Sequence, residues 1–153
     1  MPQNTTPPTV ENNIDTRSDA AQLGAPLELP PDSSLVMRVI PMPADTNMSG
    51  GVFGGWIMAQ VDIAGSVLPA KIARGRVTTV AVNRFVFKQP VSVGDLLSFY
   101  ARIERIGTTS ITVHVEVYAE RNPAKPHIVK VTDASLTYVA IDATGKPRPV
   151  PKG

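Results

Sequence analysis

An aspartate inside an apolar segment is the first residue of this sequence that could do chemistry. Residues 56–73 are apolar on nearly every side, which indicates a buried helix, and Asp62 lies in the middle of them. Burying an uncompensated carboxylate costs on the order of several kcal/mol, so such a residue is kept where it is functional or where one face of the helix meets water. Ser66, one turn further on, shares this face and would supply a neighbouring hydroxyl. A carboxylate so placed can act as a general base or as a nucleophile.

The entrance of the same helix carries a second chemical feature. Gly54 and Gly55 precede Trp56, so no side chain obstructs the first N–H groups of the helix. These donors, at the positive end of the helix dipole, suit a polarised carbonyl or an oxyanion of acyl transfer. A tight turn that needs glycine is the alternative. Asn47, in the preceding loop, could orient water or a carbonyl, or could simply form a turn.

The elements that must position these residues follow from the apolar pattern. We predict a kink or weakening of the helix at Pro69 and its end at Gly75. After Gly75 the composition changes: residues 77–87 are rich in Val, Thr and Phe, and this segment and those that follow it are predicted to be strands separated by turns. The predicted strands are residues 35–41, 77–87, 96–106, 111–118 and 128–141. One strand, one buried helix and a four-strand antiparallel meander predict an α+β domain, whose free strand edges would favour a dimer.

Composition divides the chain into three parts. Residues 1–33 are rich in Pro, Asn and Thr and bury too little apolar surface to fold alone, so we predict a flexible tail. Residues 34–142 form the predicted domain. Residues 143–153 contain three prolines and are expected to form an extended C-terminal tail.

The bulk composition also argues against several classes of protein. The net charge is +2 and no basic cluster is present, so nucleic acid is not an expected partner. No apolar run approaches the roughly 20 residues of a membrane span, and no signal-peptide pattern opens the chain, so a cytoplasmic protein is expected. With no cysteine and two histidines, we expect no thiol nucleophile, no disulfide and no metal site.

Several motifs, in order and at compatible spacing, resemble the YciA-like acyl-CoA thioesterases. The most specific is Phe-Gly-Gly-Trp-Ile-Met-Ala-Gln-Val-Asp at residues 53–62, preceded by Pro-Ala-Asp-Thr-Asn at 43–47. The similarity continues at residues 75–77, 90–95, 107–110 and 145–148, and covers about residues 35–149 in all.

This resemblance implies a hotdog fold, in which an antiparallel sheet wraps one central helix, and a dimer usually found within a hexamer. It implies hydrolysis of acyl-CoA to free fatty acid and CoA, without a separate cofactor, at a site shared across the dimer interface. Asp62 matches the catalytic helix acid, as base or nucleophile, and Asn47 matches a loop asparagine given by the facing subunit. The amides of Gly54 and Gly55 match the carbonyl-polarising turn. The residues expected along the coenzyme A path are Arg76, Thr108, Thr109 and Ser110.

Two positions depart from the family pattern. Gly51 and Asn83 stand where members often carry acids, which bears on loop order, interface polarity and rate. A non-catalytic acyl-CoA binding or sensing protein on the same fold is therefore the alternative, although the intact Asp62 argues against it. A dehydratase would need a histidine for proton transfer, and His114 and His127 lie far from the helix in sequence.

Overall fold

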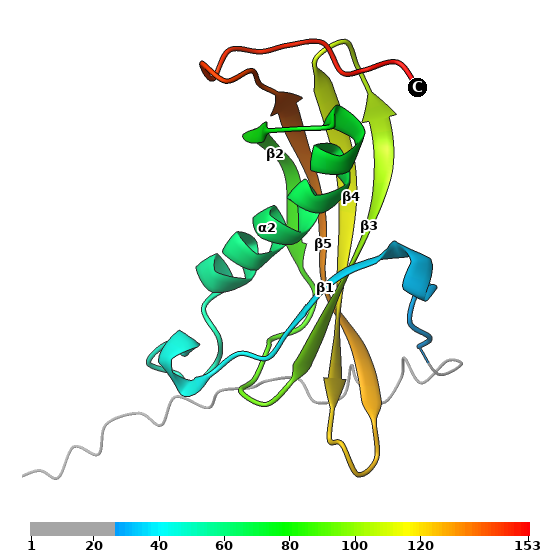
Figure 1. Ribbon diagram of the computed structural model, residues 1–153. Helices are drawn as coiled ribbons and strands as arrows, with labels where there is room; N and C mark the ends of the chain where they lie inside the picture. Colours follow the sequence, from blue (N-terminus) through cyan, green and yellow to red (C-terminus); the bar gives the residue numbers. More distant parts are fainter. Residues whose placement is uncertain (1–26) are drawn as a thin grey trace, which may run out of the picture.

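A computed structural model describes residues 27–153, so most of the predicted N-terminal tail, residues 1–26, lies outside the described residues. Within the described part, one α-helix crosses one face of a five-stranded antiparallel sheet (Figure 1). The elements are η1 (Asp32–Ser34), β1 (Leu35–Val39), η2 (Pro43–Asp45), α2 (Gly54–Ala73), β2 (Val77–Phe87), β3 (Leu96–Ile106), β4 (Ser110–Arg121) and β5 (His127–Ala140). No helix in residues 27–153 is long and apolar enough to cross a membrane.

The strand order is β1-β3-β4-β5-β2, so the predicted four-strand meander is wrong. β3, β4 and β5 do follow one another, but β2 pairs with β5, from Val77 opposite Ala140 to Phe87 opposite Thr132. Consecutive strands pair in only about two-thirds of cases, and the alternation of side chains defines strands without naming their neighbours. β2 therefore lies at one edge of the sheet.

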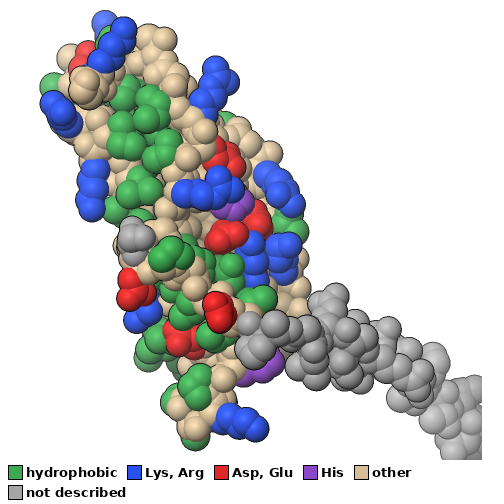
Figure 2. All heavy atoms as spheres, turned by 90° about the vertical axis from the view of Figure 1, so that its right-hand side faces the viewer, with side chains coloured by type: hydrophobic (Ala, Val, Ile, Leu, Met, Phe, Trp, Pro, Cys, Tyr) green, Lys and Arg blue, Asp and Glu red, His purple; other side chains and the backbone are tan. Residues whose placement is uncertain are grey.

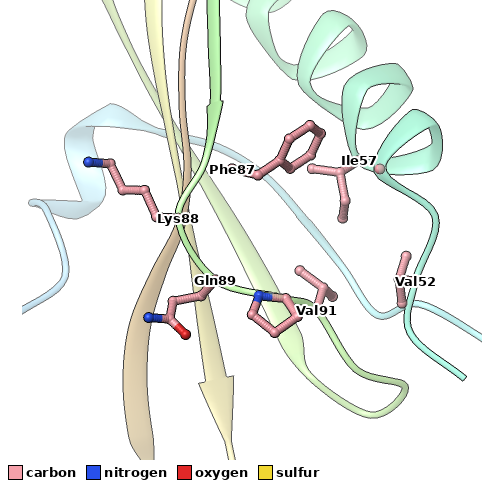
Figure 3. A pocket seen from close by; sticks show the side chains of 8 residues that line it. Val52, Ile57, Phe87, Lys88, Gln89 and Val91 are labelled. Atoms are coloured by element: carbon pink, nitrogen blue, oxygen red, sulfur yellow. The ribbon is translucent and has the colours of Figure 1, made fainter. Parts of the chain in front are cut away.

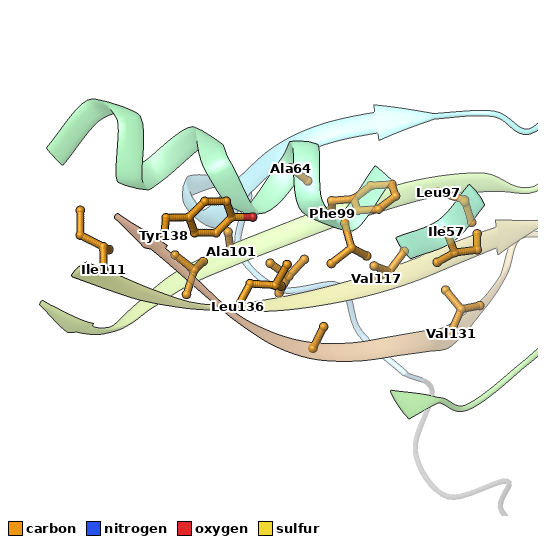
Figure 4. Close-up of a cluster of buried hydrophobic side chains, with 14 of the residues drawn as sticks. Ile57, Ala64, Leu97, Phe99, Ala101, Ile111, Val117, Val131, Leu136 and Tyr138 are labelled. Carbon is orange, nitrogen blue, oxygen red and sulfur yellow. The ribbon is translucent and has the colours of Figure 1, made fainter. Parts of the chain in front are cut away.

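The core lies between α2 and the sheet (Figure 4). On β4 the side chains of Val113, Val115 and Val117 are fully buried, as the predicted alternation requires. Val61 and Ala64 of α2 are equally buried against them. Asp62 therefore directly follows Val61, one of the most buried residues of the helix.

The helix begins at Gly54, two residues earlier than predicted, and continues through Pro69 to Ala73. Arg74 follows its last residue as the C-cap in the left-handed conformation (φ 51°), one residue before the predicted Gly75. Gly75 borders an arginine side chain: a Cβ there would lie 2.7 Å from Nη2 of Arg148 and would displace that guanidinium. That guanidinium nitrogen donates to the carbonyl of Ala73 at 2.7 Å and so binds one of the last free carbonyls of the helix.

The C-terminal segment runs along one end of the sheet (Figure 1). The N–H of Arg148 donates to the carbonyl of Ala140, and that of Val150 to the carbonyl of Thr108, both at 2.8 Å. Val150 is buried. The segment is thus hydrogen-bonded to the end of β5 and to the turn before β4, and Arg148 also reaches the C-terminal end of α2.

Candidate active site

The carboxylate of Asp62 is half-buried and is held by two hydroxyl groups of the sheet. Oγ1 of Thr79 donates to Oδ1 of Asp62 at 2.6 Å, and the hydroxyl of Tyr138 lies 3.2 Å from the same oxygen. The Tyr138 hydroxyl also donates to the main-chain carbonyl of Asp62 at 2.7 Å. Ser66, the hydroxyl partner expected from the sequence, instead donates to the carbonyl of Ile63 at 2.7 Å.

Thr79 and Tyr138 are the functional candidates that sequence reasoning missed. Tyr138 is 1% exposed. Its burial, and then the neighbouring charge and hydrogen bond of Asp62, raise the pKa of its phenol, so it remains a donor. One signal in the sequence points to it. Gly65 lies inside the helix, where glycine is unfavourable, and a Cβ on Gly65 would be 2.5 Å from the Tyr138 hydroxyl.

The helix entrance has free donors. The N–H groups of Trp56 and Ile57 both donate to the carbonyl of Phe53, at 3.1 and 3.2 Å. Within the described residues, the N–H groups of Gly54 and Gly55 have no hydrogen-bond partner. A Cβ on Gly54 would lie 3.1 Å from the ring of Phe87, whereas a Cβ on Gly55 would meet nothing within 4 Å. Gly54 thus packs closely against Phe87, and Gly55 leaves its N–H open to an approaching ligand.

An open hollow of about 390 Å³ lies beside this entrance (Figure 3). Phe87 and Ile57 form its wall nearest the helix. Its lining is mostly apolar, which suits an alkyl chain better than a charged group. The lining residues are Val52, Gly54, Ile57, Phe87, Lys88, Gln89, Pro90 and Val91.

Asn47 closes the loop that leads to the helix. Its Oδ1 accepts the N–H of Ser49 at 2.9 Å, and its own N–H donates to the carbonyl of Gly51 at 2.7 Å. The carbonyl of Asn47 also accepts the N–H of Gly50 at 3.0 Å. The loop is therefore closed by hydrogen bonds that need no acidic side chain at position 51.

The predicted site residues fall into three groups within one chain. Gly55 and Asp62 are seven residues apart on one helix, which is about 10 Å along its axis at 1.5 Å per residue. One carbonyl oxygen cannot accept a hydrogen bond from the Gly55 N–H while its carbon lies beside Asp62 of the same chain. Asn47 belongs to the loop at the Gly55 end, and no hydrogen bond joins it to Asp62.

The residues predicted for the coenzyme A path lie beyond the other end of α2. The carbonyl of Arg76 accepts the N–H of Ile141 at 3.0 Å, and the carbonyl of Thr109 accepts that of Ala140 at 2.9 Å. The end of β5 therefore brings Arg76 together with the turn of Thr108, Thr109 and Ser110. The Arg76 side chain is exposed, with Nη1 lying 3.4 Å from the carbonyl of Ala143.

Residues 49–125 match the family model of the thioesterase superfamily. The chain belongs to this superfamily. It is 48% identical over 123 residues to the acyl-CoA thioester hydrolase YciA of Salmonella typhimurium, which covers 79% of this chain and 92% of that relative. A hexameric thioesterase from Yersinia pestis is 46% identical, with a TM-score of 0.75 over 80% of this chain and 99% of that one. A hexameric hotdog-fold thioesterase of Campylobacter jejuni is 38% identical, with a TM-score of 0.74 over 77% and 90%. The hotdog fold and the resemblance to the YciA-like enzymes are confirmed.

This thioesterase also carries a cluster of opposite charges on the sheet face turned away from α2. The His114 side chain, 11% exposed, has Nε2 at 3.4 Å from Asp133 and 3.6 Å from Glu116, and Nδ1 at 3.5 Å from Glu104. Nζ of Lys130 lies 2.6 Å from Glu116 and 3.0 Å from Asp133. Figure 2 shows acidic and basic side chains gathered around a histidine.

The charges in this cluster stabilise one another. Burial raises the pKa values of Glu116 and Asp133, but Lys130 and His114 outweigh this effect and hold both pKa values below their ordinary range. Burial lowers the pKa of Lys130, and the two carboxylates outweigh this and raise it. His114, Glu116 and Asp133 have the donor types and spacing to hold a metal ion, but the ammonium group of Lys130 already supplies the positive charge between the carboxylates.

Proposed function

We propose that this protein hydrolyses acyl-CoA thioesters to free fatty acid and CoA, with Asp62 as general base or nucleophile. The observation that carries the proposal is the half-buried carboxylate of Asp62, oriented by hydroxyls from two strands. Relatives that are 46–48% identical over 123 residues are acyl-CoA thioester hydrolases by name, which supports the substrate class.

The catalytic centre is assembled from two subunits. Because Gly55 and Asp62 are about 10 Å apart along one helix, the two groups can meet at one thioester only if they come from different chains. Asp62 is bonded to Thr79 of β2, and Gly54 packs against Phe87 of the same strand. The Asp62 carboxylate and the helix-entrance amides therefore both lie beside β2, the first near Thr79 and the second near Phe87.

A two-fold axis near Asn83 would unite these halves. Asn83 lies midway between Thr79 and Phe87, so antiparallel pairing of two β2 strands centred there puts Thr79 of one subunit opposite Phe87 of the other. Asp62 then faces Gly55 and Asn47 of the partner subunit. The edge of β2 and the adjoining face of α2 expose Val80, Val82 and Ile63, which such an interface would cover.

In this arrangement the thioester carbonyl accepts a hydrogen bond from the Gly55 N–H of the partner subunit. As water or a carboxylate oxygen of Asp62 attacks the carbonyl carbon, negative charge develops on the carbonyl oxygen, which lies at the positive end of the helix dipole. Asp62 either takes the proton of the attacking water or attacks directly, and water then hydrolyses the resulting anhydride. Both routes break the carbon–sulfur bond and release CoA as its thiolate, which takes up a proton.

The coenzyme A moiety would extend from Asp62 toward Arg76 and the turn at Thr108, Thr109 and Ser110. The exposed guanidinium of Arg76 keeps donors free for a phosphate group. Similar solved thioesterases are hexameric, and we propose a homohexamer built from the dimers described above. The cytoplasmic location stays a prediction.

The proposal is tested by thiol release from acyl-CoAs of increasing chain length, followed with a chromogenic thiol reagent. The chain contains no cysteine, so the protein itself gives no background. We expect release that is lost in Asp62→Asn, while the melting temperature and oligomeric state are kept. A folded oligomer that binds acyl-CoA but releases no thiol would refute hydrolysis and favour the binding protein.

A further inference from the structure

We propose that the hollow beside the helix entrance binds the acyl chain of the substrate, and that Arg121 is a positioning residue for the wall of this hollow. The wall is the connection between β2 and β3, residues 88–95. This inference rests on the proposed hydrolysis of acyl-CoA. It deepens that function, because it names the residues by which the enzyme distinguishes one chain length from another.

The hollow begins where the acyl chain leaves the thioester. Gly54 lines the hollow, and its neighbour Gly55 has the free N–H to which the thioester carbonyl is proposed to bind. An alkyl chain attached to that carbonyl can therefore enter the hollow directly. Coenzyme A extends along the subunit that gives Asp62, so the two parts of the substrate are held by different subunits.

The lining of the hollow suits an alkyl chain. The ring of Phe87 is 52% exposed, and a chain in the hollow would cover it. Figure 3 shows Phe87 beside Ile57, whereas the side chains of Lys88 and Gln89 point away from Ile57. The charge of Lys88 is thus kept apart from the apolar part of the lining.

The wall has no regular secondary structure of its own. Residues 88–95 form no helix or strand. The carbonyl of Val91 accepts the N–H of Val52 at 3.0 Å, which joins the wall to the loop before α2. Oδ2 of Asp95 accepts the N–H of Ser92 at 3.0 Å. These bonds hold the wall to itself and to another loop, so a contact with the sheet is needed to fix its position.

One arginine of the sheet makes this contact. Arg121 is the last residue of β4; its Nε donates to Oδ2 of Asp95 at 3.1 Å, and its Nη2 donates to the carbonyl of Pro90. Asp95 is 4% exposed, and the guanidinium compensates its buried charge. The donors of a guanidinium have a fixed geometry, so together they set the position of Pro90 relative to Asp95. Because Val91 follows Pro90, the same contact sets the position of the Val91 side chain in the hollow.

The experiment measures kcat/KM by thiol release for straight-chain acyl-CoAs from acetyl to dodecanoyl. In the wild type, we expect kcat/KM to rise about fourfold for each methylene that the hollow buries, and to level off once the hollow is filled. In Arg121→Gln the rise should be about twofold or less per methylene, because a wall that is not held in place buries each methylene less completely. The ratio between chain lengths removes any general loss of activity. Arg102→Gln, which changes an exposed arginine of β3 outside the lining, is the matched control and should keep the wild-type rise.

Two further variants keep the test decisive. Arg121→Lys keeps a positive charge beside the buried Asp95, so it folds even if Arg121→Gln does not; its single nitrogen cannot reproduce both hydrogen bonds, and it should give an intermediate rise. Val91→Ile adds one methylene to the lining, so kcat/KM should level off at a shorter chain.

Each result bears on one part of the inference. The wild-type rise in a folded Arg121→Gln or Arg121→Lys enzyme would refute the positioning role. Equal kcat/KM for all chain lengths in the wild type, or an unchanged levelling point in Val91→Ile, would refute the hollow as the site of the acyl chain. Absence of thiol release from every acyl-CoA would instead refute the proposed function itself.

Discussion

Subunit mixing gives the sharpest test of the shared catalytic centre. One parent is Asp62→Asn, which removes the reacting carboxylate. The other is Gly55→Pro, which removes the N–H donor, since the first turn of a helix tolerates proline. Gly55→Ala is the matched control, because it keeps the N–H and its Cβ would meet nothing within 4 Å in the subunit.

The expected recovery of activity follows from the distance of about 10 Å between Gly55 and Asp62 along the helix, because at this distance each catalytic centre must combine Gly55 of one subunit with Asp62 of the other. Each parent alone is defective at every site, and loss of one oxyanion donor lowers kcat roughly a hundred- to a thousandfold. In random two-fold pairing, half of the dimers are mixed. Each mixed dimer has one site with both defects and one site with neither, so the mixture recovers about a quarter of the wild-type activity.

The assay is thiol release after the two parents are unfolded together and refolded at equal concentration. Each parent refolded alone, and wild type refolded alone, set the lower and upper limits. Activity equal to the mean of the two parents would show that both groups act within one chain, and would refute the shared centre. Near-normal activity of Gly55→Pro alone would remove its N–H from the mechanism.

Three further predictions concern the interface, the loop and the charge cluster. Asn83→Cys should form an inter-subunit disulfide on oxidation, because the two copies of a residue on the two-fold axis have Cα atoms about 5 Å apart. Val80→Cys is the control and should not form one, because it would lie about 20 Å from its copy. Non-reducing electrophoresis distinguishes the two variants, and a disulfide in Val80→Cys but not in Asn83→Cys would exclude this register. Asn47→Ala should lower kcat less than Asp62→Asn does. Asn47→Asp is the control, because it keeps the side-chain oxygen that accepts the N–H of Ser49 but loses the amide NH2 group. Normal activity in Asn47→Asp would show that Asn47 only closes the loop. Folding lowers the pKa of Asp133, so the ionised carboxylate stabilises the protein above its unfolded pKa, and this stabilisation is lost as the pH falls through the folded pKa. Asp133→Asn should therefore lower the melting temperature at neutral pH. The melting temperature of this variant should also fall less steeply in acid than that of the wild type.

The secondary structure could be predicted from the sequence because the apolar pattern decides it locally. The bounds of β2 and β3 agree with prediction, and α2 begins only two residues early. The strand order could not be predicted in the same way. Residues 77–87 have the composition of a strand, and nothing in that composition says whether β3 or β5 lies beside it.

The same division applies to the site. Asp62 was visible because a carboxylate breaks an apolar helix pattern, and Gly55 was visible because glycines at a helix entrance leave donors free. Thr79 and Tyr138 were missed because threonine and tyrosine are ordinary strand residues. Only Gly65, an unfavourable residue inside the helix, hinted that something approaches the backbone there.

The unexpected pairing of β2 with β5 has two consequences for the site. It places Thr79 beside Tyr138, so that two hydroxyls converge on one oxygen of Asp62. In the predicted meander β3 and β4 would separate β2 from β5, and Thr79 and Tyr138 could not both reach that oxygen. The pairing also leaves β2 at the edge of the sheet, where a second copy can add its own β2. The strand that orients the carboxylate is then the strand that brings the amide donors of the partner subunit, so formation of the dimer and completion of the catalytic centre would be one event.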